Sequence, residues 1–587
     1  MEENVEEEKC TINSLPDEII SLVLLNNDYR DIVSFGSTCK RFNELVQNDQ
    51  TLWKLQFKRT LPVDLIENVK SDCETDWLAE TKRYFTLKQQ LYAEVILMSP
   101  KLYRRSPDIS LTDIEPFFEL ALSHNLNYYY TIHILQSMVK FGSKNLGREP
   151  IKKPYTLTDI HYAKIVLRHL MHTFLAFKWV KMHHKDELSP ERVVNFFIQW
   201  TDTDLIYVDE EVDNEVLELV KKVEDLLEKP SKSRPGDTVK ELCAEGVIKE
   251  RQVLEAISQV IYSQRRMATV STANVDTLNI MKVLSGNCGN VIAIGSVYNA
   301  VAKIFGINCE LIAFPNHLFL EWRDCSERQP KLYTIELATG DIHPKRRCPF
   351  SQGGPVSTYK YYADSLLQYI YSVFHASMGA IKNWHTQNSL HLLDFLGTDN
   401  HEYNPYKNFL PYLLDLTHLP AMNMPLDLKY LDSSQIQIIR SLTNLNAPFN
   451  TALRDLVVKN HNSRVTYAAG MICYHKKYDY TCIVRGWDVT CAVEWQEIDT
   501  LEFANQPFYH VIAADQSERY VAQENLQPVP RPCRLYHLED FIAREFSHFD
   551  GFAYVPNSEK IVEYPDEAPI TNTYRNHNHL RAAPPRP

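Results

Sequence analysis

The sequence lacks the cysteine patterns of a secreted or metal-bound scaffold. Its twelve cysteines are scattered, and none forms a CxxC pair. A chain of 587 residues can fill its cores without disulfides, so we expect reduced thiols and a cytoplasmic or nuclear location. The acidic run from Glu2 to Glu8 has neither the basic stretch nor the apolar run of a secretory signal.

Long apolar runs and excess positive charge are also missing. The most apolar long segment, Val291 to Ile307, contains Asn299 and Lys303 and is shorter than the roughly 20 residues that span a bilayer. It predicts a buried helix, and we expect no membrane partner. The formal net charge of −13 gives no general attraction to nucleic acid. Gly353 and Gly354 do not lie between a strand and a helix, so they do not form a phosphate-binding loop.

The composition is that of several globular domains. Hydrophobic residues make up 44% of the chain and charged residues 23%, and a single core stops growing near about 250–300 residues. Helical periodicity dominates residues 75–230 and 356–460, whereas strand-like segments occur within 309–337 and after 463. We therefore predict a multidomain α+β fold. The stretch Lys229–Asp237, rich in Pro, Ser and charge, predicts a linker.

Apolar periodicity places the individual elements. The expected helical segments are Leu87–Met98, Ile114–Leu126, Ile132–Phe141, Ile160–Lys181, Val212–Leu227, Leu390–Phe395 and Leu410–Leu416. The expected strands are Cys309–Phe314, Leu318–Trp322, Leu332–Leu337, Ile472–Tyr474, Cys482–Gly486, Tyr509–Ala513 and Tyr520–Val521.

A compact helical pattern occupies positions 14 to 61. Leu15–Ile20 opens a first helix, with Pro16 in its first turn, where the missing N–H costs nothing. We expect Asp31 to cap a second helix whose apolar face runs over Ile32–Phe42, and Thr51 to cap a third. Such a small module cannot bury all its apolar residues, so part of its surface is expected to need a partner. The alternative is that these are the first helices of a larger helical domain.

The LPDEI pattern of Leu15–Ile19, the helical hairpin and the closing pair Leu52-Trp53 resemble an F-box over positions 14–60. The resemblance implies that the Skp adaptor is the partner, and that the adaptor bridges the chain to a cullin scaffold. The residues that it assigns to adaptor binding are Leu15, Pro16, Glu18, Ile19, Ile20 and Leu22.

A second resemblance lies between about residues 250 and 345. Gly289 precedes an apolar helix over Val291–Phe305, and Gly306 is followed by a strand, then by Phe314–Leu320 and Tyr333–Glu336. This order is similar to the SirB-type transglutaminase-like family. In its active members a Cys at a helix N-terminus attacks an acyl carbon, a His acts as its base and an acid orients the His. The resemblance implies the catalytic set Cys288, His317 and Glu336.

Two interpretations of this middle region stay open. Counting back from Gly306, the family's nucleophile falls at about Val291, one turn beyond Cys288, and a shift of ~5 Å along the helix would separate the thiol from His317. One hypothesis is a non-catalytic scaffold that offers a cleft to a peptide. The other is a thiol enzyme for acyl transfer or hydrolysis that uses Cys288 and His317. Packing of a small Cys and a hydrogen-bonded core His explains the same residues without chemistry.

The C-terminal part carries the most specific motif. Gly470 is followed by Tyr474–Tyr480, Ile483–Asp488, Gln506–Val511 and Arg519–Leu526. This looks like the YccV/HspQ family, which is also described as hemimethylated-DNA-binding, over about residues 463–530. Aromatic side chains are common anchors in protein interfaces. The substrate-binding candidates in this domain are Tyr478, Trp487, Trp495, Tyr509 and Tyr520.

The charge of this region bears on DNA binding. Residues 463–530 contain five Lys and Arg against nine Asp and Glu, a net charge of −4, and only Lys476 and Lys477 are adjacent. Phosphate contacts require clustered positive charge. We therefore expect a surface that binds protein, with DNA binding as the alternative.

No metal or cofactor is expected. His161, His169 and His172 lie in one predicted helix, but no acid or Cys completes a metal site at a fitting spacing. The side chains are better explained as a packed or solvated helix face.

The order of the three motifs resembles the F-box only protein 21 group. It implies a substrate-recognition subunit of a Skp–cullin–F-box ubiquitin ligase that promotes protein ubiquitination and degradation, without catalysis of its own. The predicted organisation is a disordered acidic tail at 1–13, the F-box at 14–60, a helical region at 75–230, the transglutaminase-like α+β domain at 238–350, a helical region at 356–460, a small β-rich YccV-like domain with an extension at 463–565 and a disordered tail at 566–587.

Overall fold

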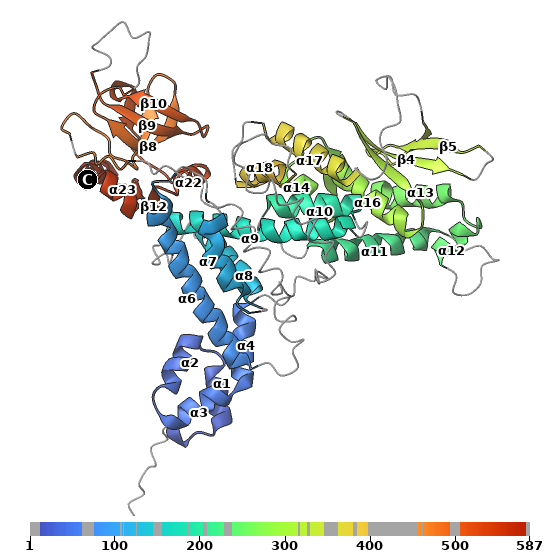
Figure 1. The fold of residues 1–587 in the computed structure, drawn as a ribbon, viewed down its shortest axis with the longest axis horizontal. Coiled ribbons are helices and arrows are strands. Elements are labelled where there is room, and N and C mark those ends of the chain that lie inside the picture. The colour runs from blue at the N-terminus through green and yellow to red at the C-terminus, as the bar shows by residue number, and fades with distance from the viewer. Residues whose placement is uncertain are drawn as a thin grey trace, which may run out of the picture.

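The structure is a computed structural model. It describes residues 12–61, 76–105, 109, 111–124, 126–144, 155–184, 188–202, 208–227, 238–314, 317–325, 329–345, 362–379, 384–396, 455–460, 462–492 and 505–582. Figure 1 shows a small helical bundle at one end of a long helix, a β-rich module near the other end and a larger α/β region to the side. Within the described ranges, no helix combines the length and the hydropathy needed to cross a bilayer.

The N-terminal bundle packs one face of each helix inward. Ile20, Ile32, Phe42 and Trp53 are at most 4% exposed, and the Trp53 indole N–H donates to the Val46 carbonyl at 2.6 Å. The bundle consists of a 3-10 turn at Ile12–Ser14, α1 (Asp17–Leu24), α2 (Tyr29–Gly36), α3 (Lys40–Asn48) and α4 (Gln50–Thr60).

Two of the predicted helix caps were wrong. Asp28, not Asp31, caps α2, and Asp49, not Thr51, caps α4 by accepting from the Leu52 amide at 2.9 Å. The expected single helix over Ile32–Phe42 is two helices, because the chain is extended at Cys39 and its sulfur caps α3. Short polar side chains occur at many positions of this segment, so their presence alone did not select the cap.

A stalk of packed helices follows the bundle (Figure 1). Helix α6 has 26 residues and is therefore about 39 Å long at 1.5 Å per residue. Asp76 caps it by accepting from two backbone amides. The bundle joins the stalk through aromatic contacts, with Tyr29 stacked on Phe85 at 3.9 Å between ring centroids and Phe57 edge-on to Trp77. The stalk helices are α6 (Trp77–Leu102), α7 (Leu111–Leu122), α8 (Asn127–Lys144) and α9 (Leu157–His184).

The middle region surrounds one apolar helix, α16 (Val291–Ile304), which is buried throughout from Ile292 to Ala302. It packs against a sheet so closely that a Cβ on Gly295 would lie 2.7 Å from a Leu337 methyl carbon. The sheet is an antiparallel meander in the order β3-β4-β5-β6, and a separate parallel pair joins β1 to β2. The strands are β1 (Ala268–Val270), β2 (Cys288–Asn290), β3 (Cys309–Phe314), β4 (His317–Asp324), β5 (Lys331–Ile335) and β6 (Ile342–Pro344).

Further helices cover α16. Helix α10 was not among the segments named from periodicity, because all its residues except Arg192 are buried and its apolar pattern therefore has almost no polar face. The indole N–H of Trp200 on α10 donates to the carbonyl of Asn388 on α18 at 3.1 Å. The helices of this region are α10 (Pro190–Thr201), α11 (Val208–Leu226), α12 (Val239–Ala244), α13 (Glu250–Ser258) with a π-helical turn at Gln259–Gln264, α14 (Val275–Leu278), α15 (Ile280–Gly286), α17 (Tyr362–Met378) and α18 (Trp384–Leu396).

The C-terminal module is a five-stranded antiparallel sheet in the order β10-β9-β8-β7-β11. One face encloses a core with Trp487 and Tyr509. The other face, with Ile483, packs against the residues that follow the sheet, including Leu538 and Phe546. The elements are β7 (Ile472–His475), β8 (Tyr480–Asp488), β9 (Phe508–Ala513), β10 (Glu518–Ala522), β11 (Leu526–Pro528), α22 (Glu539–Ile542), β12 (Phe546–Phe549), β13 (Tyr554–Pro556), α23 (Ser558–Glu563) and α24 (Glu567–Ala582).

The C-terminal module is fastened to the far end of α6. The Arg544 guanidinium donates to three backbone carbonyls there, those of Leu102, Tyr103 and Arg105, at 2.6 to 2.8 Å. The Tyr103 hydroxyl donates to Glu563 at 2.7 Å. An arginine that satisfies the free carbonyls at a helix C-terminus also complements the helix dipole. The bundle and the β module therefore lie at opposite ends of one helix (Figure 1).

The predicted disordered tail after residue 566 was wrong as far as residue 582. Helix α24 begins at Glu567, whose carboxylate accepts from the Trp487 indole at 2.7 Å and from the Ala469 amide at 2.5 Å. The Tyr574 hydroxyl donates to the Val529 carbonyl at 2.6 Å. The tail is polar in composition, but its few anchoring side chains reach into the β module, and such contacts leave no periodic signal.

The other expected elements have mixed outcomes. The expected strands coincide with β3, β4, β5 and β7 to β10, and the expected segment Leu390–Phe395 lies within α18. The expected helical segments between 87 and 227 correspond to α6, α7, α8, α9 and α11. The linker Lys229–Asp237, most of the tail at 1–13 and the segment Leu410–Leu416 lie outside the described residues.

Candidate functional site

Three aliphatic side chains form an exposed stripe on α1. Ile19, Leu22 and Val23 are 43%, 58% and 54% exposed. Their spacing of three and four residues places them on one helix face. The opposite face, with Ile20 and Leu24, is packed into the bundle. We call Ile19, Leu22 and Val23 the α1 stripe, and a gathered set of exposed aliphatic side chains is typical of a binding surface.

The predicted adaptor-binding set divides into three groups. Pro16, Glu18, Ile19 and Leu22 are exposed, and Leu15 is partly buried against the core. Ile20 is only 1% exposed, so its assignment to the contact surface was wrong. Val23 and the exposed Val33 on α2 were missed, although a step of one helical turn from Ile19 leads to Val23.

Arg41 on α3 fixes the start of α1. Its guanidinium donates to the carbonyls of Asn13 at 2.5 Å and Leu15 at 2.8 Å, and it pairs with Asp17 at 2.6 Å. These bonds join the segment before α1 to the second half of the bundle. The α1 stripe is therefore presented from a helix whose first turn is tied down.

The candidate thiol lies before α16. Cys288 is exposed and belongs to β2, which pairs with β1. Asn290 caps α16 by accepting from the Ile292 amide at 3.0 Å, and Val291 is the first residue of the helix. The helix dipole would stabilise a thiolate in the first turn of α16, and Cys288 lies outside that turn.

The structure does not describe a contact between His317 and Cys288. It is the first residue of β4 and lies opposite Phe314 in the register, but its side chain lies outside what the structure describes. Along the described part of the chain, the structure thus gives no contact between a base and the candidate thiol.

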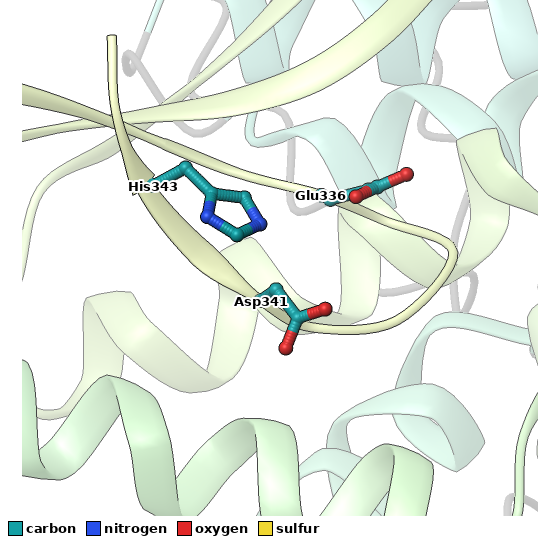
Figure 2. A group of neighbouring side chains, drawn as sticks. All are labelled: Glu336, Asp341 and His343. Carbon is teal, nitrogen blue, oxygen red and sulfur yellow. The ribbon is translucent and has the colours of Figure 1, made fainter.

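Glu336 was predicted to be the acid that orients His317, and this role stays a prediction because the His317 side chain lies outside what the structure describes. Its neighbours Ile335 and Leu337 are at most 2% exposed, and Leu337 faces Gly295 on α16. Glu336 is exposed and so points to the other side of the sheet, away from the helix that follows the thiol. There it lies beside Asp341 and His343, and ligand atoms of the three side chains are all within 4.8 Å of one another (Figure 2).

Two of the five aromatic candidates of the β module are core residues. Trp487 and Tyr509 are 1% and 0% exposed, so their assignment to a substrate surface was wrong. Both satisfy their polar atoms internally, and the Tyr509 hydroxyl donates to Gln523 at 2.6 Å. Tyr478 is 64% exposed at the turn between β7 and β8. Trp495 lies outside the described residues.

Tyr520, the remaining candidate, belongs to a polar cluster that the sequence analysis missed. Its hydroxyl donates to Asp488 at 2.8 Å, and Asp488 also contacts Lys459 at 2.7 Å and His510 at 3.0 Å. Burial opposes ionisation of Asp488, but the hydrogen bonds from Lys459 and Tyr520 outweigh it and lower the pKa of Asp488. These residues are far apart in sequence, so no local pattern indicated the cluster.

Two arginines of the β module are engaged within the protein. Arg485 forms ion pairs with Glu518 and Glu545, and Arg519 pairs with Asp515. Arginines with carboxylate partners are poorly available to phosphates, since binding would have to break existing pairs. Arg485 and Arg519 are therefore held by carboxylates, in a region (463–530) whose net charge is −4.

Comparison with known families places three domains on the chain. An F-box-like family matches residues 12–59, the transglutaminase-like superfamily matches 210–349, and the family described as hemimethylated DNA-binding protein YccV like matches 465–552. The chain matches the F-box only protein 21 group. It is 25% identical to human F-box only protein 21 over 95% of this chain and 92% of the relative.

Other members of the F-box only protein 21 group give the same result. The orangutan (Pongo abelii) protein is 24% identical over 95% of this chain, and the mouse (Mus musculus) protein is 25% identical over 94%, each across 92% of the relative. No solved structure matches the chain significantly. The transglutaminase-like match begins at residue 210 and so includes most of α11, whereas the domain was predicted to begin at residue 238.

Proposed function

We propose that the chain is the substrate-recognition subunit of a Skp–cullin–F-box ubiquitin ligase and promotes ubiquitination and degradation of proteins. The α1 stripe carries this proposal, since it is an exposed aliphatic surface on the domain that matches the F-box-like family. An adaptor with an apolar groove would cover Ile19, Leu22 and Val23 in the way that grooves take up amphipathic helices.

The arrangement along α6 supports the same role. The bundle packs on one end of this helix, and Arg544 fastens the β module at the other end. A helix of about 39 Å with both ends fixed sets the separation between the adaptor side and the β module. A receptor has to hold its substrate at a set distance from the ligase machinery, and this geometry is suited to that task.

The transglutaminase-like domain is proposed to act as a non-catalytic scaffold. Asn290, not a cysteine, occupies the cap of α16, and Val291 stands where the family's nucleophile is expected. Glu336 faces away from this helix. Because Glu336 points away from α16 and Cys288 lies outside the first turn of that helix, the geometry supports binding better than acyl transfer.

The deciding experiment measures adaptor binding by the full chain with Leu22→Asp. A buried leucine contributes about 1.5–3 kcal/mol, and a carboxylate in an apolar groove adds a desolvation penalty. We expect the affinity for the Skp adaptor to fall at least about 100-fold. Thermal unfolding should barely change, since Leu22 is 58% exposed.

A matched control separates the α1 stripe from general surface hydrophobicity. Leu97 on the stalk is 57% exposed, so Leu97→Asp makes the same chemical change at the same exposure. It should leave adaptor affinity unchanged. If the Leu22→Asp chain bound adaptor as well as the parent, or if both variants lost binding equally, the proposed docking surface would be wrong.

A further inference from the structure

We propose that Glu336, Asp341 and His343 bind a divalent transition-metal ion, with Zn²⁺ as the best fit. The three residues lie at the tip of the hairpin formed by β5 and β6, outside every surface assigned above (Figure 2). We call them the hairpin triad. One imidazole and two carboxylates form a mixed set of nitrogen and oxygen ligands, which suits Zn²⁺ better than Ca²⁺ or Mg²⁺.

The strand register brings the triad together. The Glu336 amide donates to the Asp341 carbonyl at 3.0 Å, so these residues lie opposite each other across the hairpin. Asp341 directly precedes β6 and His343 lies within it, two positions on, and side chains with that spacing along an extended chain share a face. Their ligand atoms all lie within 4.8 Å of one another. Zinc holds such atoms at about 2.0–2.2 Å, so rotamer adjustments of the exposed side chains would close the site.

The backbone beneath the triad is held in place. The Ser258 hydroxyl donates to the Gly340 carbonyl at 2.7 Å, and the Tyr262 hydroxyl donates to the Leu337 carbonyl at 2.8 Å. Gly340 has a φ of 81°, and a Cβ at this position would lie 2.5 Å from the Tyr262 ring. The turn is thus fixed from the side of α13, and binding would order only the side chains. This lowers the entropic cost of forming a site.

Charge and orientation favour a cation here. Across the described residues, neither Glu336 nor Asp341 forms an ion pair with Lys or Arg, and the nearby Lys345 is paired with Glu321. The Thr339 hydroxyl donates to one oxygen of Asp341 at 2.7 Å. A supporting hydrogen bond of this kind orients a ligating carboxylate and leaves its other oxygen for the metal. Two adjacent unpaired carboxylates repel each other until a cation neutralises them.

The test is a calorimetric titration of the full chain with ZnCl2, after treatment with a chelator and alkylation of the exposed thiols. The parent should bind one zinc equivalent that the triple variant Glu336→Gln/Asp341→Asn/His343→Ala lacks. Each single substitution should weaken binding at least about tenfold, since metal sites lose this much even when a supporting contact is removed. Hydrogen exchange over residues 332–345 should slow on zinc addition in the parent only.

Two results would overturn the proposal. Equal zinc stoichiometry in the parent and the triple variant would place any bound zinc elsewhere. Loss of binding on His343→Ala, with full affinity in Glu336→Gln and Asp341→Asn, would show a lone surface imidazole and no three-ligand site. The control variant His537→Ala removes an exposed histidine of the C-terminal module and should leave the titration unchanged.

Discussion

The two ends of α6 carry modules that place their apolar side chains differently. The N-terminal bundle exposes Ile19, Leu22 and Val23 on one helix face, each at 43% or more. The C-terminal module buries Trp487 and Tyr509 almost completely and ties their polar atoms to its own residues. The first module therefore has a free apolar surface, whereas the second has used its large aromatic side chains for its own stability.

The bundle exposes apolar side chains and the β module buries them because the two modules differ in size and in the number of layers that cover each element. A bundle of short helices has one small core, so none of the described residues covers the second face of α1. The β module has a sheet whose two faces are both covered, one by its own core and one by the residues after β11. Apolar content alone therefore does not locate a binding surface. What matters is whether the surrounding layers are sufficient to bury it.

The largest loss of stability is expected when a fully buried aromatic side chain of the β module is removed. Trp487→Ala should destabilise the β module by about 3–5 kcal/mol, since it removes a buried indole and the hydrogen bond that the indole donates to Glu567. Tyr478→Ala, at 64% exposure, should change stability by less than about 0.5 kcal/mol. Hydrogen exchange of the β8 and β9 amides in the full chain measures both. Equal protection in the two variants would contradict the assignment of Trp487 to the core.

A neighbouring pair on α1 tests the same comparison in the other module. Ile20→Ala should cost about 2–4 kcal/mol of bundle stability, because Ile20 is 1% exposed. Ile19→Ala, one residue away, should leave stability within about 0.5 kcal/mol and weaken adaptor binding. Thermal unfolding and adaptor titration of the full chains separate the two effects. If Ile19→Ala destabilised the bundle as much as Ile20→Ala, the α1 stripe would be part of the core.

Strands could be predicted from the sequence more reliably than the surfaces that bind other molecules. Alternating apolar residues placed β3, β4 and β7 to β10, because strand periodicity is local. Exposure depends on which layers meet in space, so the same analysis wrongly assigned Ile20, Trp487 and Tyr509 to binding surfaces. A local pattern shows that one face of an element is apolar but does not show what covers that face.

Contacts between segments that are far apart in the chain could not be predicted from local sequence patterns. The hairpin triad is local, within positions 336–343, but only the folded turn shows that its three side chains lie together, and no metal site was expected there. Arg544 and the carbonyl of Leu102 are 442 positions apart, and neither residue type marks the contact. The tail after 566 was misjudged for the same reason, because its order depends on where Glu567 and Tyr574 reach.

A smaller effect is expected from pH at the junction of the bundle and the stalk. Burial, together with the charges of Lys140 and Lys88, lowers the pKa of His133 from 6.5 to about 4, so this residue is neutral in the folded chain. Above pH 6.5 it is neutral in both states and costs nothing. Between pH 6.5 and 4 the unfolded chain takes up a proton that the folded chain does not, so stability falls as the pH falls. Since His133 is partly exposed, we expect a loss of about 2 kcal/mol over this window.

The acid response should begin in the stalk, because residues 12–61 contain no histidine. In the full chain, hydrogen exchange of α6 and α8 measured from pH 7 to 4.5, corrected for the intrinsic rate, reports the local loss. His133→Gln removes the titrating group and should flatten the dependence in these helices, whereas His537→Gln, at an exposed position, should leave it unchanged. A dependence that survives in His133→Gln would mean that other groups govern the acid sensitivity of the stalk. In that case protonation of His133 would not be what loosens the junction between the stalk and the bundle that carries the α1 stripe.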